Sequence, residues 1–128
     1  MIHHLSLGTN DVARARRFYD PVMALLGFNV VKARDSAVDY GLNRYFFSLE
    51  TPTNGRPASP GNGTHVAFEA ASREMVNRFH AIAMANGGTD AGPPGLRPEY
   101  DVNYYAAFVL DPDGSKIEVV TFAGPKDD

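Results

Sequence analysis

The sequence predicts an α+β fold built from two βαβββ modules in a pseudo-twofold arrangement. The two halves are similar at an offset of 61 residues, which aligns His4 with His65 and Phe18 with Phe79. Each half places a segment of helical period after a first strand and before further strands. A segment rich in proline and glycine, residues 51–63, separates the halves. Repetition of this kind is typical of a duplicated module.

In the first half, apolar alternation predicts a strand over residues 2–8. Asn10 or Asp11 can cap a helix that ends at Gly27, and Pro21 should kink that helix because it lacks a backbone donor. The residues expected on the inward face of this helix are Val12, Ala15, Phe18, Val22 and Leu25 or Leu26. Strands are then expected over residues 29–34, 37–42 and 44–50.

In the second half, a strand is expected over residues 65–70. Ser72 should cap a helix with Val76, Phe79 and Ala83 inward. Residues 104–110 and 116–122 read as a hairpin around the turn sequence Asp-Pro-Asp-Gly. We expect one domain over residues 1–128, with module one at 1–50, the linker at 51–63 and module two at 64–123.

Composition narrows the class of partner. Twelve Lys and Arg against fifteen Asp and Glu give a net charge of −3, and the sequence pI is near 5.7. This balance argues against nucleic acid or an anionic membrane as partner. The chain has no cysteine, so disulfides and thiolate chemistry are excluded. No basic and apolar leader opens the sequence, and we expect a cytoplasmic protein.

The hairpin allows side-chain faces to be predicted. If Asp111 and Gly114 close the turn, Phe108 pairs with Ile117 and faces the helix, whereas Ala107 pairs with Glu118. Tyr105 then shares the face of Glu118 and can line a cavity there. The alternatives are that Glu118 is a solvated carboxylate on a half-exposed sheet, and that Tyr105 is only a good strand former.

His4 and His65 hold equivalent places in the two modules. Together with Glu118 they would form a site of two histidines and one carboxylate, which suits iron, manganese, nickel or zinc and leaves positions open for a substrate. The alternative is that the histidines are unrelated residues at strand edges, and His3 shows that histidine occurs near this terminus without such a role.

The sequence resembles the vicinal-oxygen-chelate superfamily, which includes glyoxalase I, bleomycin-binding resistance proteins, fosfomycin-resistance thiol transferases and extradiol dioxygenases. The segments that carry the resemblance are residues 4–11, 17–19, 26–28, 65–68 and 107–119. The last contains Asp-Pro-Asp-Gly followed by Ile-Glu. The resemblance implies the glyoxalase/bleomycin-resistance/dioxygenase fold. It also implies that His4, His65 and Glu118 bind one divalent transition metal (Fe, Mn, Ni or Zn).

The fourth position of the family's metal site differs in this chain. Alignment of the last strands of the two modules places Ser48 opposite Glu118, where members similar to glyoxalase I have a carboxylate. Glu50 shares the face of Ser48 but lies two residues along, about 6.5 Å away on an extended strand. Ser48 and Glu118 are therefore the candidate catalytic positions, and Ser48 disfavours glyoxalase I activity itself.

Arg97 and Tyr100 lie in a segment, residues 92–101, that is expected to be a loop and makes the second module longer than the first. Loops of this kind often cover a site, and an arginine there can bind an anionic substrate, although a solvated surface arginine is the commoner case. His80 follows a helix core residue and is expected to be exposed.

Two functions from different classes remain open. One is a metal-dependent enzyme, related to dioxygenases, lyases or thiol transferases, that chelates neighbouring substrate oxygens on a divalent metal. The other is a metal-free protein of the bleomycin-resistance type that binds a small molecule. The resemblance also implies a homodimer, in which His4 of one chain meets His65 and Glu118 of the other if modules pair between chains.

Overall fold

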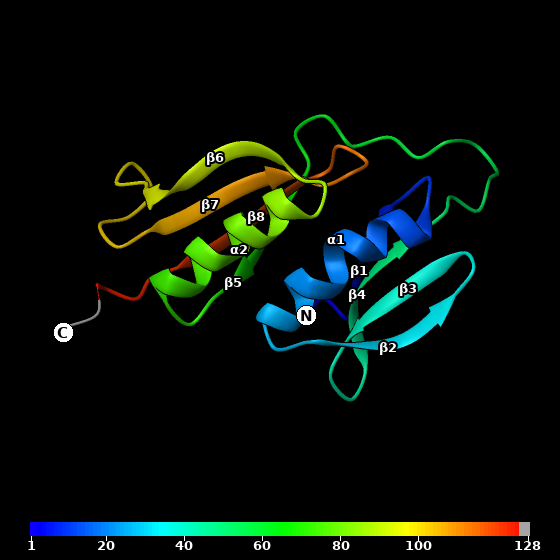
Figure 1. Ribbon diagram of the computed structural model, residues 1–128, viewed down its shortest axis with the longest axis horizontal. Helices are drawn as coiled ribbons and strands as arrows, with labels where there is room; N and C mark the ends of the chain where they lie inside the picture. Colours follow the sequence, from blue (N-terminus) through cyan, green and yellow to red (C-terminus); the bar gives the residue numbers. More distant parts are fainter. Residues whose placement is uncertain (126–128) are drawn as a thin grey trace.

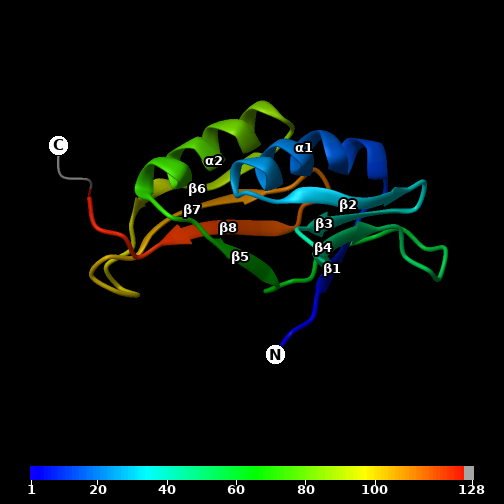
Figure 2. The same ribbon diagram turned by 90° about the horizontal axis from the view of Figure 1, so that it is seen from below.

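The computed structural model shows two four-stranded sheets, each with one helix on a single face (Figure 1). The structure describes residues 1–125, so the last three residues of the expected domain lie outside the described residues. Figure 2 shows both helices on the same side of the two sheets. The predicted α+β arrangement of two βαβββ modules is confirmed.

The first module has the strand order β1-β4-β3-β2. β1 (Leu5–Gly8) pairs parallel with β4 (Tyr45–Glu50), whereas β3 (Ala37–Gly41) lies antiparallel between β4 and β2 (Asn29–Arg34). Helix α1 (Val12–Leu25) covers one face of this sheet. Its cap is Asp11, whose side chain accepts a hydrogen bond from the Arg14 backbone N–H at 3.0 Å. The helix continues through Pro21.

The second module repeats this order as β5-β8-β7-β6. β5 (His65–Glu69) pairs parallel with β8 (Lys116–Thr121), which pairs antiparallel with β7 (Tyr105–Leu110). Helix α2 (Arg73–Ala85) begins after Ser72, whose hydroxyl accepts a hydrogen bond from the Met75 backbone N–H, as the sequence predicts.

The segment expected to be a loop over residues 92–101 is in part a strand. β6 (Thr89–Leu96) pairs antiparallel with β7 at the edge of the second sheet, with register shifts after Asp90 and after Gly92. Pro93 and Pro94 fit this edge strand because the register shift between Gly92 and Gly95 leaves both prolines without a ladder partner. The Gly-Pro-Pro-Gly sequence therefore forms a bulged edge strand rather than a loop.

One hydrophobic core joins the two modules. Phe47 of β4 and Phe68 of β5 pack edge to face with centroids 5.1 Å apart, and the two helices pack against each other. The predicted inward residues Phe18 and Phe79 are fully buried. Tyr19, which was not among the residues predicted to face inward, is also fully buried and donates a hydrogen bond to Asp111 of the second module at 2.5 Å.

The turn between β7 and β8 docks onto the start of α1. The Asp113 carboxylate accepts hydrogen bonds from the Thr9 hydroxyl at 2.6 Å and from the Asn10 backbone N–H at 3.0 Å. It also forms an ion pair with Arg14 at 2.6 Å. The side chain of Asp113 is only 3% exposed. The Asp-Pro-Asp-Gly sequence thus connects the two modules at a point away from the pocket described below.

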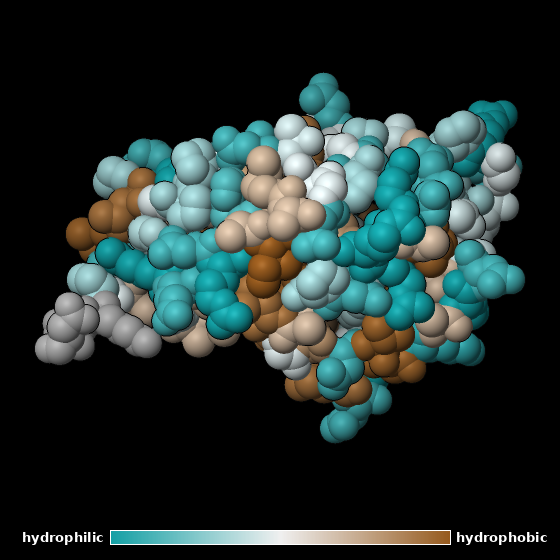
Figure 3. All heavy atoms as spheres, viewed as in Figure 1, coloured by the Kyte–Doolittle hydropathy of each residue, from teal (hydrophilic) through white to brown (hydrophobic). Residues whose placement is uncertain are grey.

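The helix-bearing face of the molecule is largely hydrophilic, with smaller hydrophobic areas near the centre, at the left edge and at the lower right of the view (Figure 3). Among residues 1–125, neither helix is long and apolar enough to cross a membrane.

Candidate functional site

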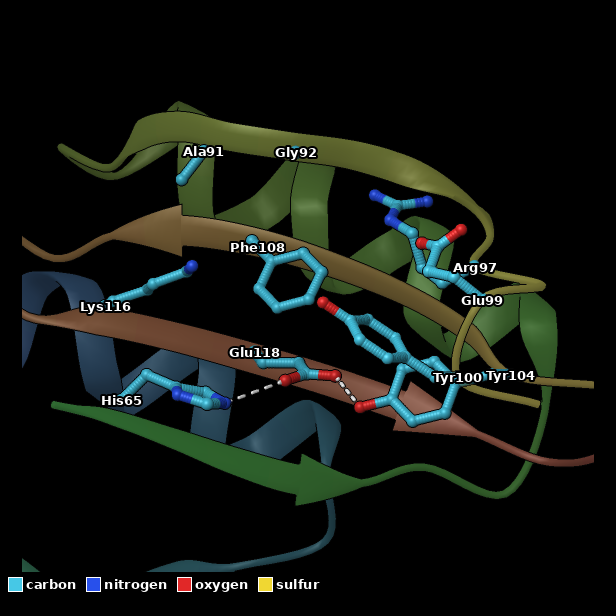
Figure 4. Close-up of a pocket in the computed structure, with 10 residues that line it drawn as sticks. All are labelled: His65, Ala91, Gly92, Arg97, Glu99, Tyr100, Tyr104, Phe108, Lys116 and Glu118. Atoms are coloured by element: carbon cyan, nitrogen blue, oxygen red, sulfur yellow. Dashed lines mark hydrogen bonds and ion pairs between the residues drawn. The ribbon is translucent and has the colours of Figure 1, made fainter. Parts of the chain in front are cut away.

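A pocket of about 470 Å³ lies on the second sheet, on the face turned away from α2 (Figure 4). Its walls come from β5, β7, β8, the middle of β6 and the turn that follows β6. The pocket contains His65 and Glu118, two of the three residues predicted to bind a metal. It also contains Arg97 and Tyr100, which the sequence analysis proposed as substrate-binding residues.

Glu118 lies at the base of this pocket in the middle of β8 and is 1% exposed. Its Oε1 lies 3.2 Å from His65 Nε2, and its Oε2 accepts a hydrogen bond from the Tyr104 hydroxyl at 2.5 Å. Since a buried carboxylate needs such partners, the solvated alternative for Glu118 is excluded. His65 reaches Glu118 because the parallel β5–β8 register pairs His65 with Lys116, two residues from Glu118 on the same face.

The expected hairpin register is wrong by one residue. Glu118 lies opposite Phe108, and Ile117 lies opposite Val109. The closing pair is Asp111 with Ser115, because the turn is followed by Gly114 in a left-handed conformation, with φ of +90°. This extra bulge residue shifts the pairing and so places Phe108 on the pocket face instead of the helix face.

The register shift also changes which of two neighbouring tyrosines lines the pocket. Tyr105 points toward α2, where its hydroxyl donates to Asn77 Oδ1 at 2.6 Å and its ring lies under Arg73. The prediction that Tyr105 lines the cavity is therefore wrong. Tyr104 lies there instead. Desolvation and the hydrogen bond to Glu118 raise the pKa of Tyr104 to about 12, so its hydroxyl is a donor at neutral pH.

The first sheet carries a second, smaller hollow of about 270 Å³ that includes His4, Ser48 and Glu50. Ser48 is buried, and its hydroxyl donates to Asp39 Oδ1 at 2.7 Å. Asp39, which sequence reasoning missed, lies opposite Ser48 on β3 and forms an ion pair with Arg34 at 3.6 Å. A single acidic residue in the otherwise apolar core of this strand was the signal that could have revealed it.

His4 is separate from His65 and Glu118 within the chain. It is exposed just before β1, with its ring beside that of Tyr45 at 4.8 Å and its Nδ1 at 2.8 Å from that of His3. No group of three or more His, Asp or Glu side chains within residues 1–125 is close enough to hold a metal ion.

His80 is less exposed than the helix pattern predicts. Its Nε2 lies 2.9 Å from Asp90 Oδ1 on β6, and its side chain is only 18% exposed. The hydrogen bond with His80, followed by that from the Gly92 backbone, lowers the pKa of Asp90. This pair connects α2 to the edge strand on the helix side of the sheet.

Comparison with known proteins identifies the family. A protein-family model described as Glyoxalase/Bleomycin resistance protein/Dioxygenase superfamily matches residues 1–119. The chain belongs to this superfamily. The match covers both modules and the residues that carry the resemblance seen in the sequence. A search of curated proteins gave no match.

Solved structures of the superfamily share the fold. A glyoxalase/bleomycin resistance protein from Albidiferax ferrireducens T118 is 39% identical with a TM-score of 0.82, over 92% of this chain and 95% of that one. A glyoxalase-related enzyme from Fulvimarina pelagi is 21% identical with a TM-score of 0.77, over 94% and 87%. A lactoylglutathione lyase from Agrobacterium tumefaciens is 22% identical with a TM-score of 0.65, over 94% and 92%.

Proposed function

We propose that this chain is a metal-dependent enzyme of the glyoxalase/bleomycin resistance/dioxygenase superfamily that acts on a small molecule. The observation that supports this most directly is the pair of His65 Nε2 and Glu118 Oε1, 3.2 Å apart at the base of a pocket. An imidazole nitrogen and a carboxylate oxygen are suitable ligands for Fe, Mn, Ni or Zn. A divalent metal held there would supply Lewis-acid stabilisation of charge on neighbouring substrate oxygens.

The third ligand, His4, would come from a second copy of the chain. Each sheet has a helix on one face only (Figure 2). The pocket with His65 and Glu118 and the hollow with His4 and Ser48 lie on the other faces. A twofold homodimer that sets the first sheet of one chain against the second sheet of the other would bring His4 to His65 and Glu118. The separation of His4 from these two residues within the chain supports this exchanged arrangement.

Tyr104 and Ser48 would have distinct roles in such a site. The Tyr104 hydroxyl donates to Glu118 and so orients its carboxylate. Ser48 is already engaged with Asp39 and has no carboxylate with which to move a substrate proton. We therefore expect little or no turnover of the methylglyoxal–glutathione adduct. This expectation differs from the activity named for the lactoylglutathione lyase from Agrobacterium tumefaciens, which is 22% identical. A robust rate with that adduct would contradict this assignment of Ser48.

The test is the metal content of the purified protein after reconstitution with several metals, measured by elemental analysis. We expect about one metal per chain in the wild type and none in His65→Ala. His80→Ala is the matched control, because His80 pairs with Asp90 outside the pocket, and it should keep its metal. Absence of metal from the wild type under all conditions would overturn the proposal.

A mixture of two variants tests whether the site is shared. His4→Ala and Glu118→Ala protein, refolded together, should form heterodimers with one complete site each. Restored metal binding would support exchange between chains. A dimer without restoration would mean that each chain holds its own site, and a monomer by light scattering would exclude the assembly.

A metal-free binding protein of the bleomycin-resistance type is the second candidate function. It is favoured by the observation that both oxygens of Glu118 already have protein partners, His65 and Tyr104. The metal analysis above separates the two functions.

A further inference from the structure

Arg97 and Lys116 lie over the same aromatic ring, that of Phe108, inside the pocket. The Arg97 guanidinium carbon lies 5.5 Å from the centroid of the Phe108 ring, and Lys116 Nζ lies 5.0 Å from the same centroid. Figure 4 shows all three side chains projecting from the same face as Glu118. Phe108 is only 9% exposed. The ring thus positions two positive charges within one pocket.

Neither cation forms an ion pair with any of residues 1–125. The pocket has two acidic residues, and neither pairs with Arg97 or Lys116. Glu118 contacts His65 and Tyr104, and Glu99 lies exposed at the rim. Arg97 uses its guanidinium only for backbone carbonyls, with Nη2 donating to Pro93 at 2.8 Å and Nη1 to Leu96 at 3.4 Å. The remaining donors of its planar fork are available to a ligand.

Two glycines of β6 provide the space in which the Arg97 guanidinium lies. A Cβ atom at Gly92 would come within 3.2 Å of Nη2 and within 3.0 Å of the Phe108 ring. A Cβ atom at Gly95 would come within 3.2 Å of Nη1. The bulged strand β6 therefore leaves room for the Arg97 guanidinium, and the two backbone hydrogen bonds hold it in place before a ligand binds. Such preorganisation lowers the entropic cost of binding.

We propose that Arg97, Lys116 and Phe108 form a subsite for the carboxylate of a small organic acid. The fork of Arg97 suits a planar carboxylate, and Lys116 adds a second positive charge. A singly charged carboxylate fits better than a phosphate dianion, because Glu99 and Glu118 lie in the same pocket and would repel the additional charge. The assignment deepens the proposed function, since it places the rest of the acid toward His65 and Glu118.

The probes are benzoate, its uncharged counterpart benzamide, and inorganic phosphate, titrated into chelator-treated protein and followed by amide chemical shifts. We expect benzoate to bind about tenfold more tightly than either benzamide or phosphate. Equal binding of benzoate and benzamide would overturn the proposal, as would tighter binding of phosphate. Because the metal has been removed, failure of this subsite and failure of the metal site are distinguished.

Variants test whether the named residues hold the anion. Arg97→Gln should weaken benzoate binding about tenfold, and Gly95→Ala should weaken it without removing a charge, because the guanidinium must move. Arg56→Gln, in the exposed linker, is the matched loss of one arginine and should bind benzoate as the wild type does. Wild-type affinity in Arg97→Gln, with the amide spectrum otherwise unchanged, would refute the assignment.

Discussion

Replacement of Asp113 by alanine should weaken the contact between the two modules and leave the pocket unchanged. The carboxylate accepts hydrogen bonds from the Thr9 hydroxyl and the Asn10 backbone N–H, and it pairs with Arg14. Thr9 is fully buried, so loss of its bond to the charged carboxylate costs about 1.5–2 kcal/mol, whereas loss of the bond from the exposed Asn10 backbone costs about 0.5–1 kcal/mol. The ion pair adds roughly 0.5 kcal/mol, because the Arg14 side chain is 40% exposed. The free energy of unfolding should fall by about 3 kcal/mol.

The assay is urea denaturation of wild-type and variant protein, with Tm as a second measure. A loss of about 3 kcal/mol corresponds to a decrease in Tm of about 10 °C for a chain of this size. Asp101→Ala is the control, because Asp101 is exposed and its carboxylate accepts only a local bond from the Asn103 backbone. It should cost less than about 1 kcal/mol. If the two variants lose the same stability, the turn does not connect the modules as described.

Three further predictions concern stability. Tyr104→Phe removes one hydrogen-bond donor from buried Glu118 and should lower the free energy of unfolding by about 1–2 kcal/mol. Tyr105→Phe removes only an exposed hydrogen bond to Asn77 and should cost less. Equal losses of stability in urea denaturation would contradict the observed register. Gly114→Ala should cost about 1–2 kcal/mol because φ is +90° there, and a variant as stable as wild type by the same assay would show that this backbone relaxes freely. The hydrogen bonds from His80 and Gly92 hold the pKa of Asp90 below its ordinary 3.8. The ionised Asp90 therefore stabilises the fold above that pH, and this stabilisation is lost as the pH falls through the lowered pKa. The stability difference between wild type and Asp90→Asn should therefore narrow below about pH 4, and a constant difference across pH titrations would refute this.

Periodicity and capping were sufficient to predict most of the fold. The strand over residues 29–34 has the predicted bounds, and Ser72 caps α2 as expected. Strand bounds and helix caps depend on residues that are close together in the chain, so a single sequence is enough to predict them. The bulged strand at 89–96 was missed because proline and glycine there resemble a loop, and only pairing with β7 reveals a strand.

The candidate site was predicted in part. Glu118 and His65 meet, because residues of the same parity on paired parallel strands share a face. The partner tyrosine was misassigned between Tyr104 and Tyr105, since a single left-handed glycine in the turn decides the register. Phe108 was assigned to the wrong face and Asp39 was missed for a related reason: the place of each depends on which residue lies opposite it on the next strand.

The duplicated sheets carry the buried acid of their helix-free face on different strands. In the second copy the acid is on the last strand, Glu118, opposite Phe108; in the first, the acid is on the neighbouring strand, Asp39, opposite Ser48. Partners on adjacent antiparallel strands are about 5 Å apart. An exchange of side chains across the ladder therefore relocates a negative charge by that distance while every backbone hydrogen bond is kept. An ancestral symmetric protein could acquire two unlike faces by point substitutions alone.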